Sequence, residues 1–302
     1  GASRWEKAMV DLSLSPAGTA PVADTPAHDI PLYGVPAGRR ITMRDLAQAT
    51  LRGERWPMIT AYDALTARIF DEAGIPALLV GDSAAMVVYG HDSTLPVTVD
   101  ELVPLVRAVV RGSQRSVVIA DLPFGSYQAS VTQALETATA FMKDGGAHAV
   151  KLEGGRPVLA QVEALAGAGI PVIGHLGLTP QSVNLLGGYR VQGRGEAGER
   201  LLHDAKEMEA AGAAAVVLEV VPADLATRVS EVLTIPTIGI GAGSGTDAQV
   251  IVWQDLVGLT AGPPPKFVRQ YTDLRSPLSS AVSQWGRDVR EGAYPAAEHA
   301  YA

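Results

Sequence analysis

The chain has 302 residues, and a single α/β barrel takes roughly 250, so one barrel with tails fits this length. A formal net charge of -8 argues against nucleic acid or an anionic membrane as the main partner, and no apolar run approaches the ~20 residues that cross a bilayer. The absence of cysteine excludes disulfides and thiolate chemistry, and nothing near the start resembles a signal peptide, so we expect a cytoplasmic protein.

The first part of the chain differs in composition from the rest. Residues 1–40 are rich in Pro, Ala, Ser and Gly with no sustained periodicity, and we expect them to form a mostly disordered extension. Residues 41–302 are expected to form the catalytic domain. Its first element is a helix, which Thr42 caps with an acid, Asp45, three residues later, and which fades near Gly53.

Strands and helices alternate after this helix, and a glycine that ends each helix recurs just before the next strand. Eight predicted strands separated by helical segments favour a (βα)8 TIM barrel over a doubly wound sheet. A terminal helix is predicted over 278–290, ended by Gly292. The predicted strands span residues 58–61, 77–81, 117–121, 148–152, 171–175, 214–219, 236–240 and 256–260.

Four of these apolar strands stop at a carboxylate: Asp82, Asp121, Glu153 and Glu219. Ligands bind at the carboxyl ends of parallel strands, so we expect these acids to converge. The first three lie on adjacent strands, and three oxygen ligands without Cys favour Mg²⁺ or Mn²⁺ over Zn²⁺. The alternative, that each acid caps a helix or pairs with a buried Lys or Arg, explains one isolated acid better than three neighbours.

Two basic side chains fall at the same end of the barrel. Lys151 lies two residues before Glu153 and shares its face, so it can bind a substrate carboxylate or an enolate oxygen. A structural salt bridge explains the spacing equally well. A Schiff base on Lys151 would require a depressed pKa, which nearby carboxylates oppose. His175 ends the fifth strand and is either a catalytic group or a hydrogen-bonded core residue.

Glu219 differs from the other acids because it follows a wholly apolar run. A carboxylate there should be partly desolvated, which suits general acid or base work. A buried acid satisfied by a lysine of a neighbouring strand is the alternative. Two long rim loops, Ser83–Pro96 and Gly177–Gly195, are expected to be lids, binding loops or subunit contacts.

At this point the chain resembles a known family, ketopantoate hydroxymethyltransferase. The matching phrases run in order through most of the chain after residue 41, and jointly they are specific. They are Ile59–Asp63, Val80–Ser83, Gly90–Pro96, Ala120–Phe124, Val150–Gly155, Gly174–Gln181, Val191–Arg194 and Gly239–Gly243.

The resemblance implies a (βα)8 barrel of the phosphoenolpyruvate/pyruvate type, assembled as a homodecamer. It also implies transfer of a hydroxymethyl group from 5,10-methylenetetrahydrofolate to 3-methyl-2-oxobutanoate through a Mg²⁺-stabilised enolate, an early step of pantothenate synthesis.

Roles carry over by position. Asp82 and Asp121 resemble the Mg²⁺ ligands, with Glu153 completing the shell directly or through water. The keto acid would be held by Asp82, Ser83, Asp121 and Lys151, with His175 as a supporting contact. Glu219 resembles the proton acceptor.

Other functions remain to be weighed against this one. A Mg²⁺-dependent lyase or mutase of the isocitrate lyase/phosphoenolpyruvate mutase type also acts on keto-acid enolates, but such lyases typically carry a Lys-Lys-Cys-Gly-His loop and this chain has no Cys. A Schiff-base aldolase at Lys151 is a second alternative. A non-catalytic scaffold ranks last, because it leaves four acids at the mouth unexplained.

Overall fold

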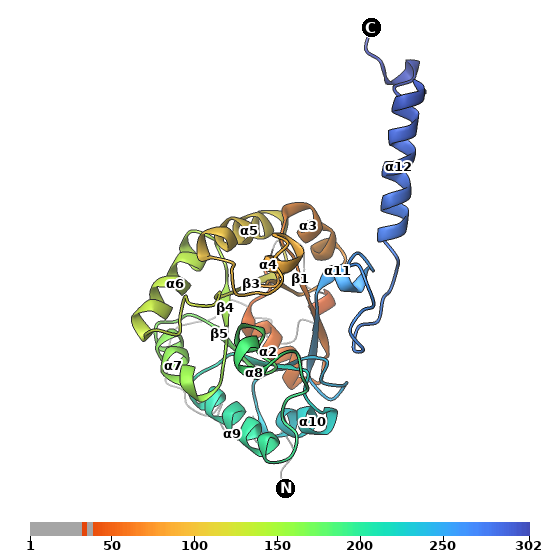
Figure 1. The fold of residues 1–302 in the computed structure, drawn as a ribbon. Helices are drawn as coiled ribbons and strands as arrows, with labels where there is room; N and C mark the ends of the chain where they lie inside the picture. Colours follow the sequence, from red (N-terminus) through yellow and green to blue (C-terminus); the bar gives the residue numbers. More distant parts are fainter. Residues whose placement is uncertain (1–31, 35–38) are drawn as a thin grey trace. The chain divides into compact units, whose positions relative to one another are not determined.

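The computed structural model describes residues 32–34 and 39–302, so most of the predicted N-terminal extension lies outside the described residues. The chain divides into two compact units, one ending at Ile251 and the other spanning Val252–Ala302. In the described part of the first unit, eight parallel strands pair in sequence order and close into a barrel (Figure 1). The predicted barrel is therefore confirmed.

Seven of the strands lie within two residues of their predicted positions. Each is a short run of buried residues, as expected for a parallel sheet covered by helices. The strands are β1 (Trp56–Thr60), β2 (Ala77–Val80), β3 (Val117–Asp121), β4 (Ala149–Glu153), β5 (Val172–Gly177), β6 (Ala215–Glu219), β7 (Thr237–Ile240) and β8 (Ala248–Ile251).

The prediction for the eighth strand, at residues 256–260, is wrong. β8 is Ala248–Ile251, which pairs with both β7 and β1, while Trp253–Leu256 forms the short helix α11. The error has a physical origin. β8 alternates, with Ala248 and Val250 buried inside the barrel and Gln249 exposed, so it lacks the continuous apolar run by which the other strands were predicted.

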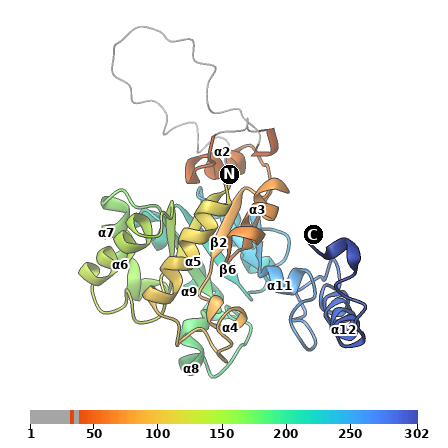
Figure 2. The ribbon, with the colours of Figure 1, turned by 90° about the horizontal axis from the view of Figure 1, so that it is seen from above.

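Long helices surround the barrel, while two short ones lie at its carboxyl end (Figures 1 and 2). The outer helices are α3 (Ala64–Glu72), α5 (Val99–Gly112), α6 (Val131–Lys143), α7 (Leu159–Gly167), α9 (Glu196–Ala210) and α10 (Ala223–Val232). The short helices α4 (Ala84–Val87) and α8 (Val183–Leu186) belong to the two predicted rim loops. They lie at the opposite end of the barrel from α2 (Met43–Leu51) in Figure 2.

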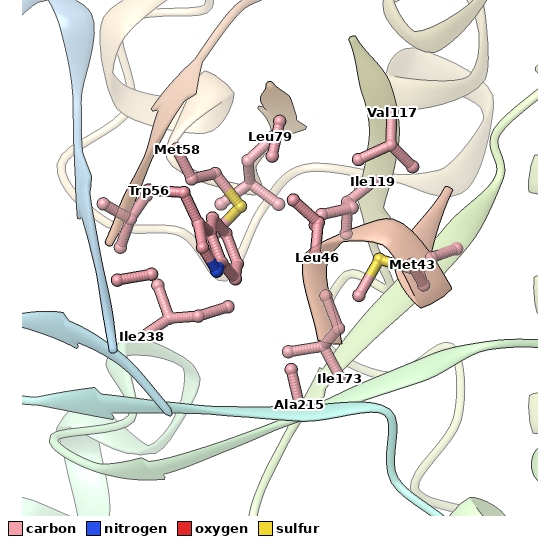
Figure 3. Packing of buried hydrophobic residues seen from close by; sticks show 14 of the residues in the cluster. Met43, Leu46, Trp56, Met58, Leu79, Val117, Ile119, Ile173, Ala215 and Ile238 are labelled. Atoms are coloured by element: carbon pink, nitrogen blue, oxygen red, sulfur yellow. The ribbon is translucent and has the colours of Figure 1, made fainter. Parts of the chain in front are cut away.

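The helix α2 closes the amino-terminal end of the barrel. Its predicted N-cap is confirmed: the Thr42 hydroxyl accepts a hydrogen bond from the Asp45 amide, and the Asp45 carboxylate accepts one from the Thr42 amide. Met43 and Leu46 pack in the same buried cluster as Trp56 of β1 (Figure 3). The Trp56 indole N–H also donates to the Thr50 hydroxyl, 3.1 Å away, which ties α2 to the first strand.

The second unit contains α11 and the long helix α12 (Arg275–Glu291). Gly292 ends α12 in a left-handed conformation with φ 75°, so the predicted terminal helix and its stop are confirmed. One face of α12 carries exposed apolar side chains at helical spacing, Leu278, Val282, Trp285 and Val289. Among the described residues, no helix combines the length and apolarity needed to span a bilayer.

Candidate active site

The charged residues of the site continue the inward face of the strands. Along β3, β5 and β6, Ile119, Ile173 and Val217 point into the barrel core, so the residue two positions later points inward one layer higher. Those positions are occupied by a charged or titratable residue in each strand. They are Asp121, His175 and Glu219, joined on β4 by Lys151 and Glu153. The predicted convergence at the carboxyl end is therefore observed.

A line of polar contacts crosses the barrel interior from β3 to β6. The Lys151 Nζ lies 2.9 Å from Asp121 Oδ1, and the two residues are register partners. Lys151 Nζ also lies 3.1 Å from His175 Nδ1. His175 Nε2 in turn lies 3.0 Å from Glu219 Oε2. Glu219 is thus linked to Lys151 through His175.

The electrostatics assign protonation states along this line. Burial alone would lower the pKa of Lys151, but the nearby acids Asp121 and Glu153 more than offset this and raise it. Burial and the Lys151 ammonium lower the pKa of His175. A charged Lys151 therefore donates to Nδ1 of a neutral His175, whose Nε2–H faces Glu219. A Schiff base at Lys151 is disfavoured, because it needs the free amine.

Asp82 and Glu153 complete the group of acids. The Asp82 backbone N–H donates to Asp121 Oδ2 at 2.9 Å, which brings these two carboxylates together. Glu153 Oε1 lies 3.7 Å from His175 Nδ1. Burial and the neighbouring Asp121 carboxylate raise the pKa of Asp82. Burial and the Asp82 carboxylate raise the pKa of Glu153. Lys151 supplies one positive charge to this set, and a bound cation would favour the ionised forms of the remaining acids.

Ser83 also lies where the sequence predicts, just after the Asp82 turn. Its hydroxyl is 2.6 Å from the hydroxyl of Tyr62, which follows β1. The turn is crowded: a Cβ at Gly81 would lie 2.8 Å from Ser83 Oγ and 3.4 Å from Asp121 Oδ2. Glycine at position 81 therefore allows the turn after β2 to approach the end of β3 closely.

Two buried residues contact the acids without having been predicted as site residues. Gln181, in the rim loop after β5, donates from its backbone N–H to Glu153 Oε2 and from its side chain to Asp82 Oδ2. Tyr127, after β3, donates to the Gln181 side-chain oxygen at 2.6 Å and accepts from the Glu153 backbone N–H at 3.0 Å. Neither residue lies on a strand, so no strand periodicity indicates which way its side chain points.

The residue after Glu219 has an unusual backbone. Val220 has φ 49°, in the left-handed region, which costs a β-branched residue roughly 1–2 kcal/mol. Its N–H donates to the Ile240 carbonyl, and its carbonyl accepts from the Gln192 N–H of the rim loop. The chain thus turns sharply at the end of β6 and joins that loop directly behind Glu219.

Carboxylate oxygens are suitable ligands for a hard cation, although the side chains are not already arranged as a complete set of metal ligands. Among the described residues, no group of three His, Cys, Asp or Glu side chains is placed so that it could hold a metal ion. Asp82 and Asp121 nevertheless offer two adjacent carboxyl groups, and Mg²⁺ typically takes one or two carboxylates, with substrate oxygens and waters filling the rest. Glu153 Oε2 already accepts from Gln181, which favours a contact through water.

Solved structures similar to this chain define the class of barrel. Phosphonopyruvate hydrolase, in a complex with oxalate and Mg²⁺, superposes with a TM-score of 0.56 at 14% identity, covering 86% of this chain and 93% of its own. The 2,3-dimethylmalate lyase, a member of the PEP mutase/isocitrate lyase superfamily, gives 0.54 at 16% identity, covering 87% and 93%. This likeness shows the fold, a (βα)8 barrel of the kind that these two enzymes have.

Sequence comparison narrows the class to one family. The sequence model of ketopantoate hydroxymethyltransferase matches residues 40–297. The 3-methyl-2-oxobutanoate hydroxymethyltransferase of Frankia casuarinae is 62% identical over 92% of this chain and 99% of its own length. That of Thermobifida fusca is 63% identical over 90% and 97%. The chain belongs to the ketopantoate hydroxymethyltransferase family and is a hydroxymethyltransferase.

Proposed function

We propose that this enzyme transfers the one-carbon unit of 5,10-methylenetetrahydrofolate to 3-methyl-2-oxobutanoate, giving 2-dehydropantoate for pantothenate synthesis. The atoms balance with one water, which supplies the hydroxyl oxygen and leaves tetrahydrofolate. The observation that carries the proposal is the buried line from Asp121 through Lys151 and His175 to Glu219. It offers a fixed positive charge at one end and a carboxylate base at the other.

The keto acid is proposed to bind at the Lys151 end of the line. The Lys151 ammonium can pair with a substrate carboxylate or with the oxygen that becomes negative on enolisation. Ser83, held by Tyr62, offers a hydroxyl donor on the neighbouring strand end. Asp82 and Asp121 would hold Mg²⁺, which when bound supplies Lewis-acid stabilisation to the oxygens of the keto acid.

Glu219 is proposed as the base that removes the proton from carbon 3. Its side chain is 17% exposed, so it is partly desolvated yet open toward the mouth. The C–H electron pair moves into the enolate, and carbon 3 then forms a bond to the methylene carbon of the folate. Both methylene carbon–nitrogen bonds of the folate break in the overall reaction: carbon 3 replaces one nitrogen and the oxygen of a water replaces the other. The proton from carbon 3 and one proton of that water end on the two folate nitrogens. His175 places its Nε2–H beside Glu219 Oε2 and thereby orients the carboxylate. The rim loops would limit access of water to the enolate until the carbon–carbon bond has formed.

Proton NMR of 3-methyl-2-oxobutanoate in D₂O tests this mechanism without the folate. With the enzyme and MgCl₂, the proton on carbon 3 should exchange for deuterium. Glu219→Gln should retain the fold and slow exchange by about 10²- to 10⁴-fold, the range typical of a positioned base. Exchange at the wild-type rate in this variant would reject the role of Glu219.

The metal is tested separately with Asp121→Asn, which keeps the side-chain shape and removes one charge. Binding of the keto acid to the wild-type enzyme should require Mg²⁺ in calorimetric titrations. The variant should lose that dependence. A wild-type titration curve from Asp121→Asn would remove Asp121 from the proposed metal site.

We also propose that the enzyme is a cytoplasmic homodecamer. The exposed apolar stripe of α12, which includes Trp285, supports self-association, because helices with such a face normally bury it. Sedimentation analysis of the full chain should give a decameric mass. Trp285→Lys should lower that mass while the barrel remains folded, and an unchanged mass would separate α12 from assembly.

A further inference from the structure

Gln181 is a glutamine with nearly all of its surface buried, and every polar atom of its side chain has a partner. It is 6% exposed and lies in the short 3-10 helix Pro180–Ser182, at the start of the rim loop after β5. Its Nε2 donates to Asp82 Oδ2 at 2.8 Å and to the Leu122 carbonyl at 3.0 Å. Its Oε1 accepts from the Tyr127 hydroxyl at 2.6 Å.

These partners determine which way the amide is oriented. The opposite orientation would direct Oε1 at the Asp82 carboxylate and at the Leu122 carbonyl, both of which are acceptors. It would also direct the NH₂ group at Tyr127, whose hydroxyl now donates to the amide. Tyr127 therefore fixes Gln181, and Gln181 fixes one oxygen of Asp82.

The backbone of the same residue holds a second acid. The Gln181 N–H donates to Glu153 Oε2 at 2.9 Å, so one residue contacts carboxylates on β4 and after β2. Both acids are buried, and a buried carboxylate that lacks a hydrogen-bond donor is costly. The position of Gln181 at the start of the rim loop therefore determines the positions of the Asp82 and Glu153 carboxyl groups.

On the basis of the proposed function, we infer that Gln181 is a positioning residue for the cation. It holds the Asp82 carboxylate beside Asp121. Because Gln181 belongs to the rim loop, the position of this carboxylate depends on the conformation of the loop. Groups that orient metal ligands in this way typically contribute about 10- to 100-fold to metal affinity. Gln181 itself contributes no bond to the reacting atoms.

Mn²⁺ binding to the full chain, followed by electron paramagnetic resonance in the absence of substrate, tests this inference. Gln181→Met preserves length and volume and removes the donor to Asp82. The affinity for Mn²⁺ should fall by about 10- to 100-fold, and the rise of the unfolding temperature on adding MgCl₂ should shrink accordingly. An affinity equal to that of the wild type would overturn the inference.

Gln161→Met is the matched control. Gln161 is also buried, at 5% exposure, and its amide donates to the Tyr127 backbone carbonyl at 3.2 Å. This variant should lose stability but keep the wild-type Mn²⁺ affinity. An equal loss of affinity in both variants would show that general loosening, and not the bond to Asp82, weakens binding, which also overturns the inference.

Tyr127→Phe keeps the test decisive if Gln181→Met does not fold. Without the Tyr127 hydroxyl, the Gln181 side-chain oxygen keeps the longer hydrogen bond from Gln128 Nε2, at 3.3 Å, so the amide is held less firmly and Mn²⁺ affinity should fall in the same direction by a smaller factor. Unchanged affinity would count against the inference. Failure of the proposed function looks different, since the wild-type enzyme would then bind no Mn²⁺ at all.

Discussion

The two ends of the barrel interior are built on the same strands and have opposite properties. At the amino-terminal end, Trp56, Met58 and the side chains of α2 form a close-packed apolar cluster (Figure 3). At the carboxyl end, one step of two residues further along the strands, the interior holds carboxylates, a lysine and a histidine. The change occurs within a single strand, between Ile119 and Asp121 for example.

This difference separates the source of stability from the source of chemistry. Burying apolar side chains at one end stabilises the fold by roughly 25 cal/mol per Å². Burying several like charges at the other end opposes folding unless partners or a cation compensate. The first end therefore offsets the cost of the second, and substitutions at the two ends should have different signatures.

The largest effect is expected from breaking the charged end. Lys151→Met leaves the buried Asp121 without its cation, and removing one partner of a buried pair costs about 3–5 kcal/mol. Urea unfolding should show this loss, together with loss of activity. Adding Asp121→Asn should restore part of the stability and none of the activity, whereas strictly additive losses would contradict the assigned pairing.

A loss of similar or slightly smaller size, confined to stability, is expected at the apolar end. Trp56→Ala opens a cavity beneath α2 and removes the bond to Thr50, at a cost of about 3–5 kcal/mol. Below its unfolding temperature the variant should exchange the substrate proton at the wild-type rate. Slower exchange per folded molecule would show that the two ends are not independent.

A pH effect of opposite sign distinguishes the ends. Burial, together with Arg40, lowers the pKa of His148, at the start of β4, from 6.5 to about 4, and its Nδ1 accepts from the Val118 N–H. The unfolded chain binds the proton first, so the stability that neutral His148 provides is lost as pH falls from about 6.5 to 4. The raised pKa of Glu153 acts the other way, because its protonation at lower pH favours the folded state.

His148→Gln isolates this effect from the titration of the site acids. The stability difference between wild type and variant, measured by urea unfolding, should shrink as pH falls through that window. A difference that stays constant from neutral to acid pH would mean that His148 does not hold its neutral form in the folded protein.

The smallest effect is expected at the cap of α2. Thr42→Ala removes the hydroxyl that accepts from the Asp45 N–H, which should cost about 1 kcal/mol. Activity should not change, because the helix lies at the end of the barrel away from the acids. Thr98→Ala, in the equivalent capping box of α5, is the matched control for cap loss elsewhere.

The strands and the acids were predictable because they depend on local sequence. An uninterrupted apolar run such as Val117–Ala120 predicts a buried strand, and the Asp121 that follows it predicts a carboxylate at the strand's end. β8 was not predictable by that signal, since Gln249 interrupts it. The contact between His175 and Glu219 depends on which strands are neighbours in the closed barrel. The contact between Gln181 and Asp82 depends on the path of a loop, which no periodicity in the sequence encodes.

The apolar layer beneath the acids also limits the direction from which solvent deuterium can reach the site. Leu79, Ile119, Ile173 and Val217 form a buried layer without polar side chains between the site and α2. Deuterium from the solvent therefore has to reach Glu219 past the rim loops. Label from the solvent therefore enters the keto acid from the mouth of the barrel, where the Glu219 side chain is 17% exposed.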